Sequence, residues 1–433
     1  MPESLSRRGL LGWGAASAAV GAVGFAGGMA TANASEGDGD GRGDGDGTAG
    51  DAKAVASDSV SFYGAHQAGI VTPAQDRLHF AAFDVTTTSR DDLVALLTAW
   101  TAAAAEMTAG RPVGGDPTSY SAPPNDSGEA DGLSASRLTL TFGFGPTLFR
   151  DAVGKDRFGL AARQPAALQR LPHFPADALD PARSDGDLCV QACADDPQVA
   201  VHAIRNLARI GFGVVSLRWS QLGYGRTSST STAQATPRNL FGFKDGTANL
   251  KAEDPSALDA HLWVGAKDDA KAPWMAGGSY LVARRIAMNL ETWDRSSLRE
   301  QEAIIGRDRR EGAPLSGGKE FTAPDFTIKG REGQPLVAAN SHVAMAHPTR
   351  NGGVQMLRRG YNYTDGSDDL GRMDAGLFFI AYVRNPAKQY IPMQTRMAKQ
   401  DALQEYLQHR GSALFAIPPG VKEGEHIGQA LFA

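Results

Sequence analysis

Hydrophobic and polar positions alternate along this chain in two successive rounds of strand, helix and strand. The pattern predicts strands over 78–85, 138–144, 187–194, 212–220, 279–290, 343–346, 356–363, 376–383 and 414–417. It predicts helices over 90–107, 197–209, 293–305 and 393–408. A period of two indicates half-buried strands, and apolar residues three or four apart indicate helices. The predicted fold class is therefore α+β.

The repeated order of strand, helix and strand is that of a ferredoxin-like unit. Two such units side by side give a dimeric α/β-barrel-like fold with antiparallel sheets and outer helices. We assign residues 59–230 to the N-terminal half and residues 231–433 to the C-terminal half. Two polar segments, 110–132 and the Ser/Thr-rich 221–237, are predicted to be surface loops.

The N-terminus has the features of an export signal. Arg7 and Arg8 precede a weakly apolar, Gly- and Ala-rich run over 12–29, and Ala32-Asn33-Ala34 offers a small-residue cleavage site. This pattern predicts a twin-arginine signal peptide over 1–34 rather than a transmembrane anchor. The mature protein is then periplasmic or secreted and keeps no stable membrane span.

Composition adds further limits. With 42% hydrophobic and 21% charged residues and a net charge of -5, the chain is typical of soluble globular proteins and carries no excess of basic residues, so no nucleic-acid partner is predicted. Residues 35–58 are rich in Gly and Asp and then Ala, which favours a flexible linker over a calcium-binding repeat. The two cysteines, Cys189 and Cys193, lie on one strand face about 13 Å apart. That distance predicts two buried thiols and no disulfide.

A glycine turn around Asp245 is the strongest chemical signal. Gly242 and Gly246 permit a positive φ and a close approach of the backbone to a flat ligand. An Asp-Gly pair alone also suits an ordinary hairpin turn. The flanking Phe241 and Phe243 argue against that alternative, because surface turns rarely carry two aromatic residues.

Two histidines and an arginine complete the candidate site. His342 and His347 lie five residues apart in a predicted strand, so they face opposite sides and at most one binds an iron. His347 precedes Pro348, where strand pairing ends, so His342 is the preferred axial ligand of a haem. Arg358 needs an anionic partner on its strand face, which Asp245, a haem propionate or a peroxide-derived oxygen could supply. A structural ion pair is the alternative.

These residues occur within motifs that resemble the dye-decolorising peroxidase family, most closely its exported, EfeB-like deferrochelatase branch. The similarity runs from about Phe62 to the C-terminus. The motifs are 62–70, the Gly-x-x-Asp-Gly core at 242–246, 305–315, Ser341-His342, 357–361 and 377–379. Six motifs in family order make the resemblance specific.

The resemblance implies a role for each site residue. It implies that Asp245 is the distal acid and base, that Arg358 is its distal partner, and that His342 is the proximal iron ligand. The implied haem contacts are Gly246, Thr247, Ala248, His347, Pro348, Thr349, Arg358, Leu377 and Phe379. An acid is expected to accept the proximal imidazole N–H, and Asp401 occupies the family's acidic position, although Asp374 is also near in sequence.

The implied activity is a haem peroxidase that reduces hydrogen peroxide and oxidises small organic electron donors in one-electron steps. One haem b per chain is expected without covalent attachment, because the sequence has no Cys-x-x-Cys-His. A carboxylate base predicts an acidic pH optimum. The main alternative is a deferrochelatase that extracts iron from haem, with iron-uptake components as partners. A chlorite-detoxifying relative is a weaker alternative, and a homo-oligomer is compatible with the sequence.

Bulky dyes are expected to react at the surface, because a pocket between Asp245 and Arg358 is narrow. Six aromatic residues are candidates for passing electrons to it, although core packing explains each equally well. They are Trp263, Trp274, Trp293, Tyr361, Tyr363 and Tyr382.

Overall fold

The computed structural model describes residues 58–114, 120–331 and 333–433, so the predicted signal peptide and linker residues 35–57 lie outside the described residues. The strands are β1 (Arg77–Val85), β2 (Thr139–Phe144), β3 (Leu188–Ala194), β4 (Val215–Arg226), β5 (Ser279–Met288), β6 (Leu357–Arg358), β7 (Tyr361–Ser367), β8 (Met373–Val383) and β9 (Leu407–Ile417). The α-helices are α2 (Arg90–Thr108), α3 (Pro146–Phe149), α4 (Pro197–Ile210), α5 (Pro255–His261), α6 (Leu290–Trp293), α7 (Leu298–Ile305), α8 (His342–Ala346), α9 (Tyr390–Gln400) and α10 (Gln429–Phe432). Short 3-10 turns include η4 (Pro348–Arg350) and η5 (Ala402–Tyr406).

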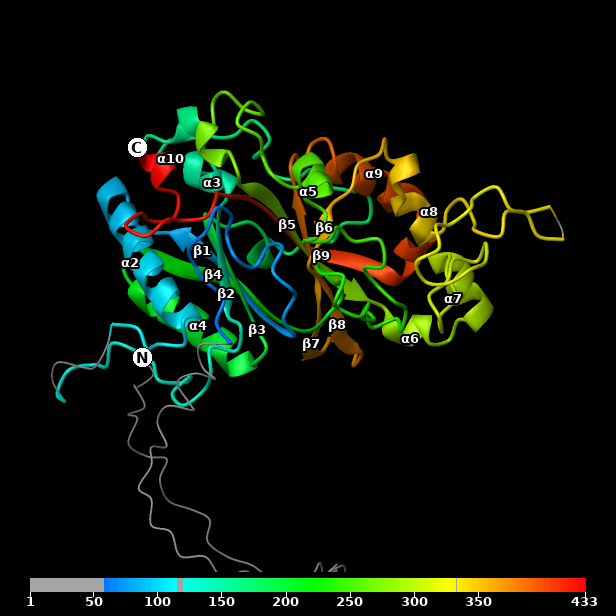
Figure 1. Cartoon of the computed structure of the whole chain (residues 1–433), viewed down its shortest axis with the longest axis horizontal. Coiled ribbons are helices and arrows are strands. Elements are labelled where there is room, and N and C mark those ends of the chain that lie inside the picture. Colours follow the sequence, from blue (N-terminus) through cyan, green and yellow to red (C-terminus); the bar gives the residue numbers. More distant parts are fainter. Residues whose placement is uncertain (1–57, 115–119, 332) are drawn as a thin grey trace, which may run out of the picture. The chain divides into compact units, whose positions relative to one another are not determined.

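The strands pair in one antiparallel sheet that closes on itself as a barrel (Figure 1). The N-terminal strands have the order β4-β1-β3-β2, and the C-terminal strands have the equivalent order β9-β5-β8-β7. Fourth, first, third, second is the order of a ferredoxin-like sheet in each half. The short β6 continues the register of β7 along β8. The predicted fold of two ferredoxin-like units is confirmed.

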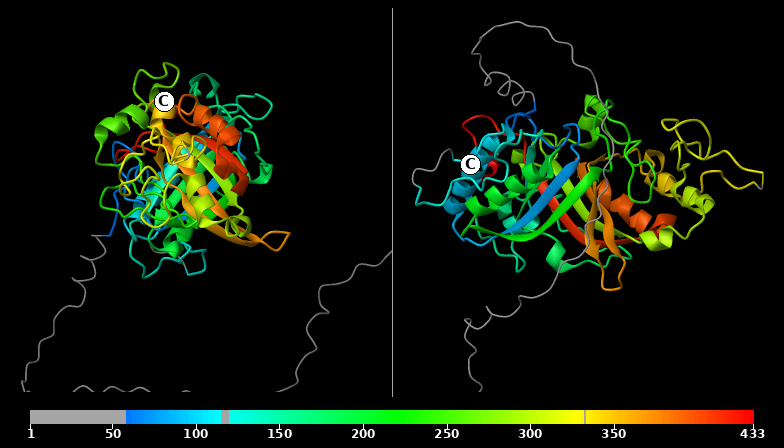
Figure 2. Two further views of the ribbon diagram at one scale, coloured as in Figure 1. Left: turned by 90° about the vertical axis from the view of Figure 1, so that its right-hand side faces the viewer. Right: turned by 90° about the horizontal axis from the view of Figure 1, so that it is seen from below.

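The two halves meet at two narrow seams. β2 pairs with β9 only through Phe144 and Ala416. β4 pairs with β7 only through Tyr224 with Asn362 and Arg226 with Tyr361, and the pairing ends with a hydrogen bond from the N–H of Thr227 to the carbonyl of Gly360 at 2.9 Å. The right-hand view of Figure 2 shows the blue and green strands of the first half beside the orange strands of the second.

Apolar side chains fill the barrel, and helices cover its outside. Phe80 stacks on Trp219 with ring centroids 5.3 Å apart, and Phe378 and Phe415 also contact Phe80 in the interior. On the outer face of the first half, α4 packs on β1 and β3, and α2 packs on α4. Both cysteines are buried in the interior as free thiols, as the sequence predicts.

The predicted single helix over 293–305 is wrong. α6 ends at Trp293 and α7 begins at Leu298. The Ser297 hydroxyl accepts a hydrogen bond from the backbone N–H of Glu300, and this cap starts a new helix. Side-chain periodicity does not reveal such a break, because Ser also occurs on helix surfaces.

The predicted helix over 393–408 is too long. α9 ends at Gln400, and the Asp401 carboxylate accepts the backbone N–H of Leu403 at the start of η5. β9 therefore begins at Leu407, seven residues before the predicted strand. Asp401 acts here as a cap, which ends one element and starts the next.

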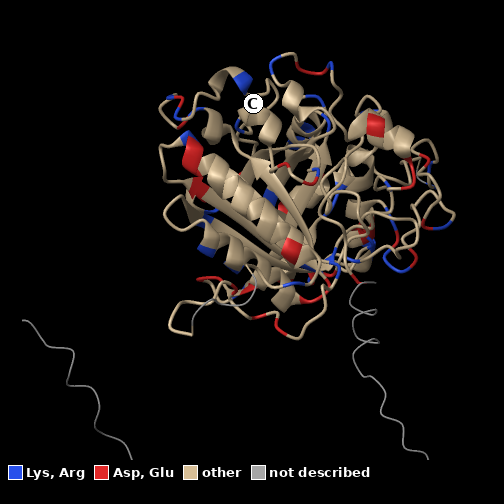
Figure 3. Ribbon diagram, turned by 60° about the vertical axis from the view of Figure 1, so that its left-hand side comes forward, with Lys and Arg blue, Asp and Glu red and all other residues tan. Residues whose placement is uncertain are grey.

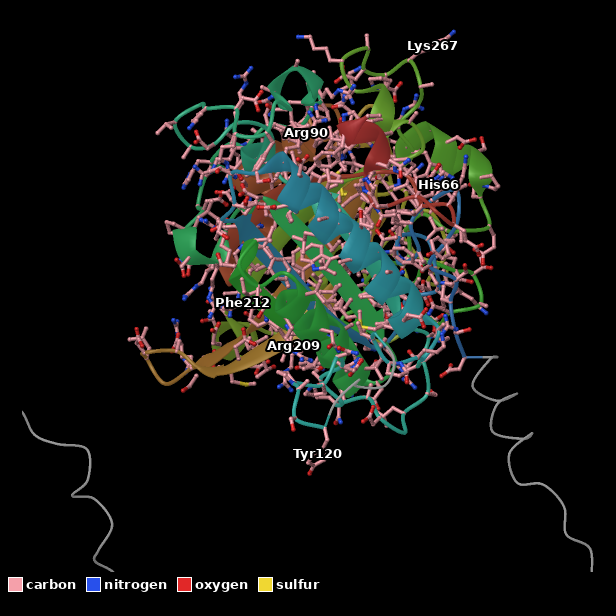
Figure 4. The ribbon with its side chains drawn as sticks, turned by 90° about the vertical axis from the view of Figure 1, so that its left-hand side faces the viewer. His66, Arg90, Tyr120, Arg209, Phe212 and Lys267 are labelled. Carbon is pink, nitrogen blue, oxygen red and sulfur yellow. The ribbon has the colours of Figure 1, made fainter. Side chains whose placement is uncertain are left out.

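The predicted boundaries around β4 are also wrong. Phe212 lies in the turn after α4 and is 91% exposed (Figure 4), and the strand starts only at Val215. Residues 221–226 continue the strand, and residues 227–231, predicted as surface loop, are buried. Their small hydroxyl side chains find partners inside, as Thr230 Oγ1 does with the carbonyl of Thr72 at 2.8 Å. A Ser/Thr-rich composition therefore does not distinguish a buried from an exposed segment.

Two histidines, the partly buried His79 and the buried His409, predict a fold that loses stability in acid. Burial lowers the pKa of His79 to about 4, and burial together with Arg284 lowers the pKa of His409 to about 3. Below the ordinary pKa of 6.5 the unfolded chain binds more protons than the folded chain, so the unfolding free energy falls as the pH falls. We expect a loss of roughly 1 to 2 kcal/mol per histidine between about pH 6.5 and pH 5.

Urea unfolding of the parent and of His409→Gln between neutral pH and pH 5 checks this expectation. The variant should show a shallower fall in stability, because its buried side chain no longer titrates. His173→Gln, which replaces an exposed histidine, should keep the parental slope. Identical slopes for His409→Gln and the parent would contradict the assignment.

Candidate active site

Asp245 pairs with Arg358 through one carboxylate oxygen and with Asn239 through the other. Arg358 Nη1 donates to Asp245 Oδ1 at 2.6 Å, and Asn239 Nδ2 donates to Asp245 Oδ2 at 3.2 Å. The Arg358 side chain is 28% exposed and that of Asp245 is 15% exposed. Asp245 is thus a partner of Arg358, as one of the three predictions had it.

The turn that carries Asp245 has the expected backbone. Gly242 has φ +81° and Gly246 has φ +90°, both in the left-handed region that favours glycine. A Cβ at position 246 would lie 2.8 Å from the Cα atom of Ser228, so the turn rests directly on the buried segment 227–231. The backbone N–H of Asp245 donates to the carbonyl of Pro237 at 2.9 Å. The carboxylate therefore projects from a fixed backbone.

A second loop holds this turn in place. Arg238 Nη1 donates to the carbonyl oxygens of Gly242 at 2.7 Å and of Arg309 at 2.6 Å. Lys244 forms an ion pair with Glu320, whose other oxygen accepts the hydroxyl of Thr247 at 3.3 Å. Thr247 thus faces this loop, and the adjacent residue, Ala248, is exposed.

The predicted strand over 356–363 is divided into β6 and β7 at Arg359 and Gly360. A Cβ at position 360 would lie 2.8 Å from Thr227 Oγ1 and 3.1 Å from Leu377 Cδ1, so only glycine fits between these side chains. The alternation survives the interruption. Leu357, Arg359 and Tyr361 are buried, whereas Arg358 points to the other side, toward Asp245.

His342 begins a helix, so the predicted strand over 343–346 is wrong. The helix is only five residues long, too short for its period to be read. It ends because His347 precedes proline and takes an extended conformation, with φ −66° and ψ 139°. His342 and His347 therefore lie at the two ends of α8 and not on opposite faces of a strand.

A buried carboxylate orients His342. His342 Nδ1 lies 2.7 Å from Asp401 Oδ2, and Asp401 Oδ1 accepts the N–H of Leu403 at 2.9 Å. The Asp401 side chain is fully buried, and the His342 side chain is 33% exposed. Asp374, the other acid near in sequence, accepts a hydrogen bond from Arg285 Nη2 at 2.8 Å instead. The structure thus brings Asp401, not Asp374, to the imidazole.

Electrostatics connects the two sides of the site. Burial lowers the pKa of His342, but Asp401 more than offsets this effect, so the pKa is raised overall. Smaller contributions come from Asp245, which raises this pKa, and from Arg358, which lowers it. The ion pair therefore lies within electrostatic reach of the imidazole.

The remaining predicted contacts lie around these groups. His347 Nδ1 lies 2.8 Å from Thr349 Oγ1 across Pro348, and its ring contacts Phe326 edge-on at 5.1 Å. Burial, then Arg307 and Arg350, lower the pKa of His347. This histidine is thus engaged locally and away from Asp401.

Leu377 and Phe379 lie on the outer face of β8, whereas the alternate residues Phe378 and Ile380 face the barrel interior. Phe379 approaches Tyr390 with ring centroids 6.1 Å apart. Leu377 packs against an apolar cluster that includes Phe241 and Trp293. The outer face of β8 thus adjoins both the Asp245 turn and α9.

The donor set fits a haem iron. His342 donates Nδ1–H to Asp401, and no side chain or backbone group of the described residues bonds to its Nε2. A carboxylate behind a ligating histidine fixes the ring and raises its basicity. The Ser228 hydroxyl beside Gly246 is buried and has no hydrogen-bond partner among the described residues. A polar ligand or a water bound with it would satisfy that group.

Three side chains of the site escaped the sequence-based reasoning. Asn239 orients Asp245, Asn249 contacts the backbone of Arg358, and Ser228 lies beneath the Gly246 turn. The two asparagines lie a few residues on either side of the Gly-x-x-Asp-Gly core. Their closeness to that core was the available signal.

Sequence comparison places this constellation in one family. The description "Dyp-type peroxidase, N-terminal" matches residues 67–225, and "Dyp-type peroxidase, C-terminal" matches residues 236–422. The chain belongs to the Dyp-type peroxidase family and is a haem-dependent oxidoreductase that acts on peroxide. The resemblance found in the sequence is confirmed.

Individual relatives agree with this membership. Deferrochelatase of Escherichia coli (strain K12) is 37% identical over 375 residues, which is 86% of either chain. Ferric DtpA from Streptomyces lividans is 39% identical with a TM-score of 0.79, over 88% of this chain and 99% of that chain. A DyP-type peroxidase from Cellulomonas bogoriensis is 39% identical with a TM-score of 0.76, over 87% and 99% of the two chains.

Proposed function

We propose that this protein is a haem b peroxidase that reduces hydrogen peroxide at Asp245 and Arg358 and oxidises small organic donors outside the cytoplasm. The observation that carries the proposal is the Asp245–Arg358 pair within electrostatic reach of a histidine whose Nδ1 is bonded to a buried acid. Acidic and basic positions are interspersed over the view in Figure 3, which suits small diffusible substrates better than a polyanion.

In this proposal each residue has a defined task. A bound haem would supply the iron at which the peroxide is reduced, and His342 Nε2 would hold that iron. Asp245 takes a proton from the inner peroxide oxygen and delivers it to the outer oxygen. Arg358 stabilises the negative charge that develops as the O–O bond breaks. One non-covalent haem per chain would contact Gly246, Thr247, Ala248, His347, Pro348, Thr349, Arg358, Leu377 and Phe379.

Absorption spectra of the haem-reconstituted protein test the iron ligand. We expect His342→Ala to lose or displace the parental Soret band, and Asp401→Asn to weaken haem or iron retention by about 10- to 100-fold. Asp374→Asn is the matched control, because its carboxylate pairs with Arg285. A parental spectrum in His342→Ala would show that the ligand is another residue.

A deferrochelatase activity is the second candidate. It is favoured by the 37% identity to the Escherichia coli protein of that name. In this case the same site would bind haem and release its iron, with iron-uptake components as partners. Anaerobic incubation with haem, followed by a search for metal-free protoporphyrin, distinguishes the two. If the haem stays intact and the protein still turns over peroxide, the deferrochelatase candidate is rejected and the peroxidase function is kept.

Export by the twin-arginine route belongs to the same proposal and rests on Arg7, Arg8 and the following apolar run. Among the described residues no helix is both long and apolar enough to cross a membrane. The N-terminal sequence of the protein recovered from the periplasm or the medium tests this part, with Ser35 expected as the first residue. Retention in the cytoplasm with Met1 or Pro2 as the first residue would contradict export.

A further inference from the structure

Between β4 and β6, a side chain and not a strand makes the hydrogen bonds to the backbone of Arg358. On one edge, β6 pairs with β8, and the N–H of Arg359 donates to the carbonyl of Ile380 at 2.8 Å. Because successive residues of a strand direct their N–H and C=O groups to opposite edges, those of Arg358 point away from β8. The chain after β4 makes its last backbone hydrogen bond to this edge from the N–H of Thr227 to the carbonyl of Gly360 at 2.9 Å, and among the described residues no strand pairs with Arg358 on this side.

Asn249 takes the place of the missing strand. The N–H of Arg358 donates to Asn249 Oδ1 at 2.7 Å, and Asn249 Nδ2 donates to the carbonyl of Arg358 at 2.9 Å. These are the two hydrogen bonds that a paired backbone residue would make. The side chain is 93% buried, since only 7% of Asn249 is exposed, and water cannot easily replace it.

The same asparagine is fixed to the turn that carries the catalytic acid. The N–H of Asn249 donates to the carbonyl of Gly246 at 3.0 Å. Asn249 Nδ2 also reaches the carbonyl of Ser229 at 3.1 Å, in the buried segment beneath that turn. One residue therefore connects the backbone of Arg358 to the backbone that follows Asp245.

We infer that Asn249 is the positioning residue that sets the distance between Arg358 and Asp245 for the reduction of peroxide. The inference rests on the proposed roles of these two residues. Asn249 acts only through the main chain of Arg358 and does not reach the reacting atoms. Without its carboxamide, a buried N–H and a buried C=O lose their partners, and β6 moves to find others. A displacement of about 1 Å at a catalytic group can lower a rate about 100-fold.

The test is a double-mutant cycle on the rate constant for the reaction of the haem-loaded enzyme with peroxide, followed by stopped-flow absorption. We expect Asn249→Ala to lower this rate constant by about 10- to 100-fold in the parental background. In an Arg358→Leu background it should lower the rate constant by less than about threefold, because the group that it positions is gone. Haem content and the melting temperature are measured for every variant.

Asn362→Ala is the matched control. Asn362 is also buried and bridges the same seam, but its side chain donates to the carbonyl of Gly225 at 3.0 Å and not to Arg358. It should keep the peroxide rate constant within about threefold of the parent, because residues without shared partners act independently.

The outcomes separate the inference from the function on which it rests. If Asn249→Ala lowers the peroxide rate constant by the same factor in the parental and the Arg358→Leu backgrounds, Asn249 has a general structural role and the inference is overturned. An unchanged rate in Asn249→Ala overturns it as well. If Arg358→Leu alone leaves the peroxide rate unchanged, the proposed role of Arg358 is wrong. Should Asn249→Ala not fold, Asn249→Ser is put through the same cycle, and the same two results decide.

Discussion

Replacing Asp245 by Asn should lower the rate constant for peroxide reduction by about 10²- to 10⁴-fold while the haem stays bound. The amide has nearly the shape of the carboxylate and can still accept a hydrogen bond from Arg358. It cannot take up a proton and deliver it to the leaving oxygen. The loss is therefore in the acid–base step and not in the architecture of the turn.

Stopped-flow absorption with limiting peroxide measures this step separately from the oxidation of the donor. The acidic optimum expected for a carboxylate base should disappear in Asp245→Asn. Asp374→Asn again serves as the control, since it removes a carboxylate that pairs with Arg285 and leaves the site intact. A rate near that of the parent in Asp245→Asn would assign the proton transfer to another group, such as an ordered water.

The second large effect concerns stability. Asp177 and Arg284 form an ion pair in which both side chains have no exposed surface, and the pair joins a loop of the first half to β5 of the second. Removing one partner of such a pair leaves a buried charge without compensation. We expect Asp177→Ala to lower the unfolding free energy by about 3 to 5 kcal/mol.

Urea unfolding at neutral pH measures this loss. Asp268→Ala is the surface control, because Asp268 and Arg384 are each about one-third exposed, and we expect a change below about 1 kcal/mol. The double variant Asp177→Leu/Arg284→Met should recover much of the loss, because no charge remains buried. A small effect of Asp177→Ala alone would mean that water reaches the guanidinium.

The sequence predicted those parts of the fold whose signal is local. The strand predicted over 138–144 alternates and the one over 376–383 is a continuous apolar run, and β2 and β8 confirm them. The order of strands and helices then leads to two ferredoxin-like halves. α8 was predicted wrongly because five residues do not show a helical period, and Val343 favours a strand when it is read alone.

The candidate site shows the same division. The sequence was sufficient to propose three site residues. Glycines flank Asp245, Arg358 needs an anionic partner on its strand face, and His342 is preferred because His347 precedes proline. The choice of Asp401 over Asp374 could not be made from the sequence, because it depends on how the turn between α9 and η5 directs Asp401 toward α8. The role of Asn249 depends on a strand that ends early, and β4 gives no sign of its end in its own sequence.

The electron path to bulky donors stays a prediction. The six aromatic candidates are all buried, with exposures of 9% for Trp263, 5% for Trp274, 2% for Trp293 and 0% for Tyr361, Tyr363 and Tyr382. Their burial agrees with the alternative of core packing. Any one that also carries electrons to the site must receive them from a further group at the surface.

The two consecutive arginines at the end of β6, Arg358 and Arg359, limit how this protein can be redesigned. Arg358 points toward Asp245, whereas Arg359 is 1% exposed inside the barrel, where its Nη1 donates to the carbonyl of Thr72. A shift of one residue along this strand would exchange the two, because side chains alternate between the faces of a sheet. Insertions for fusion partners or tags are therefore best placed in exposed loops away from the site, such as the one around Val153, and directed evolution near Arg358 should use substitutions and leave the chain length unchanged.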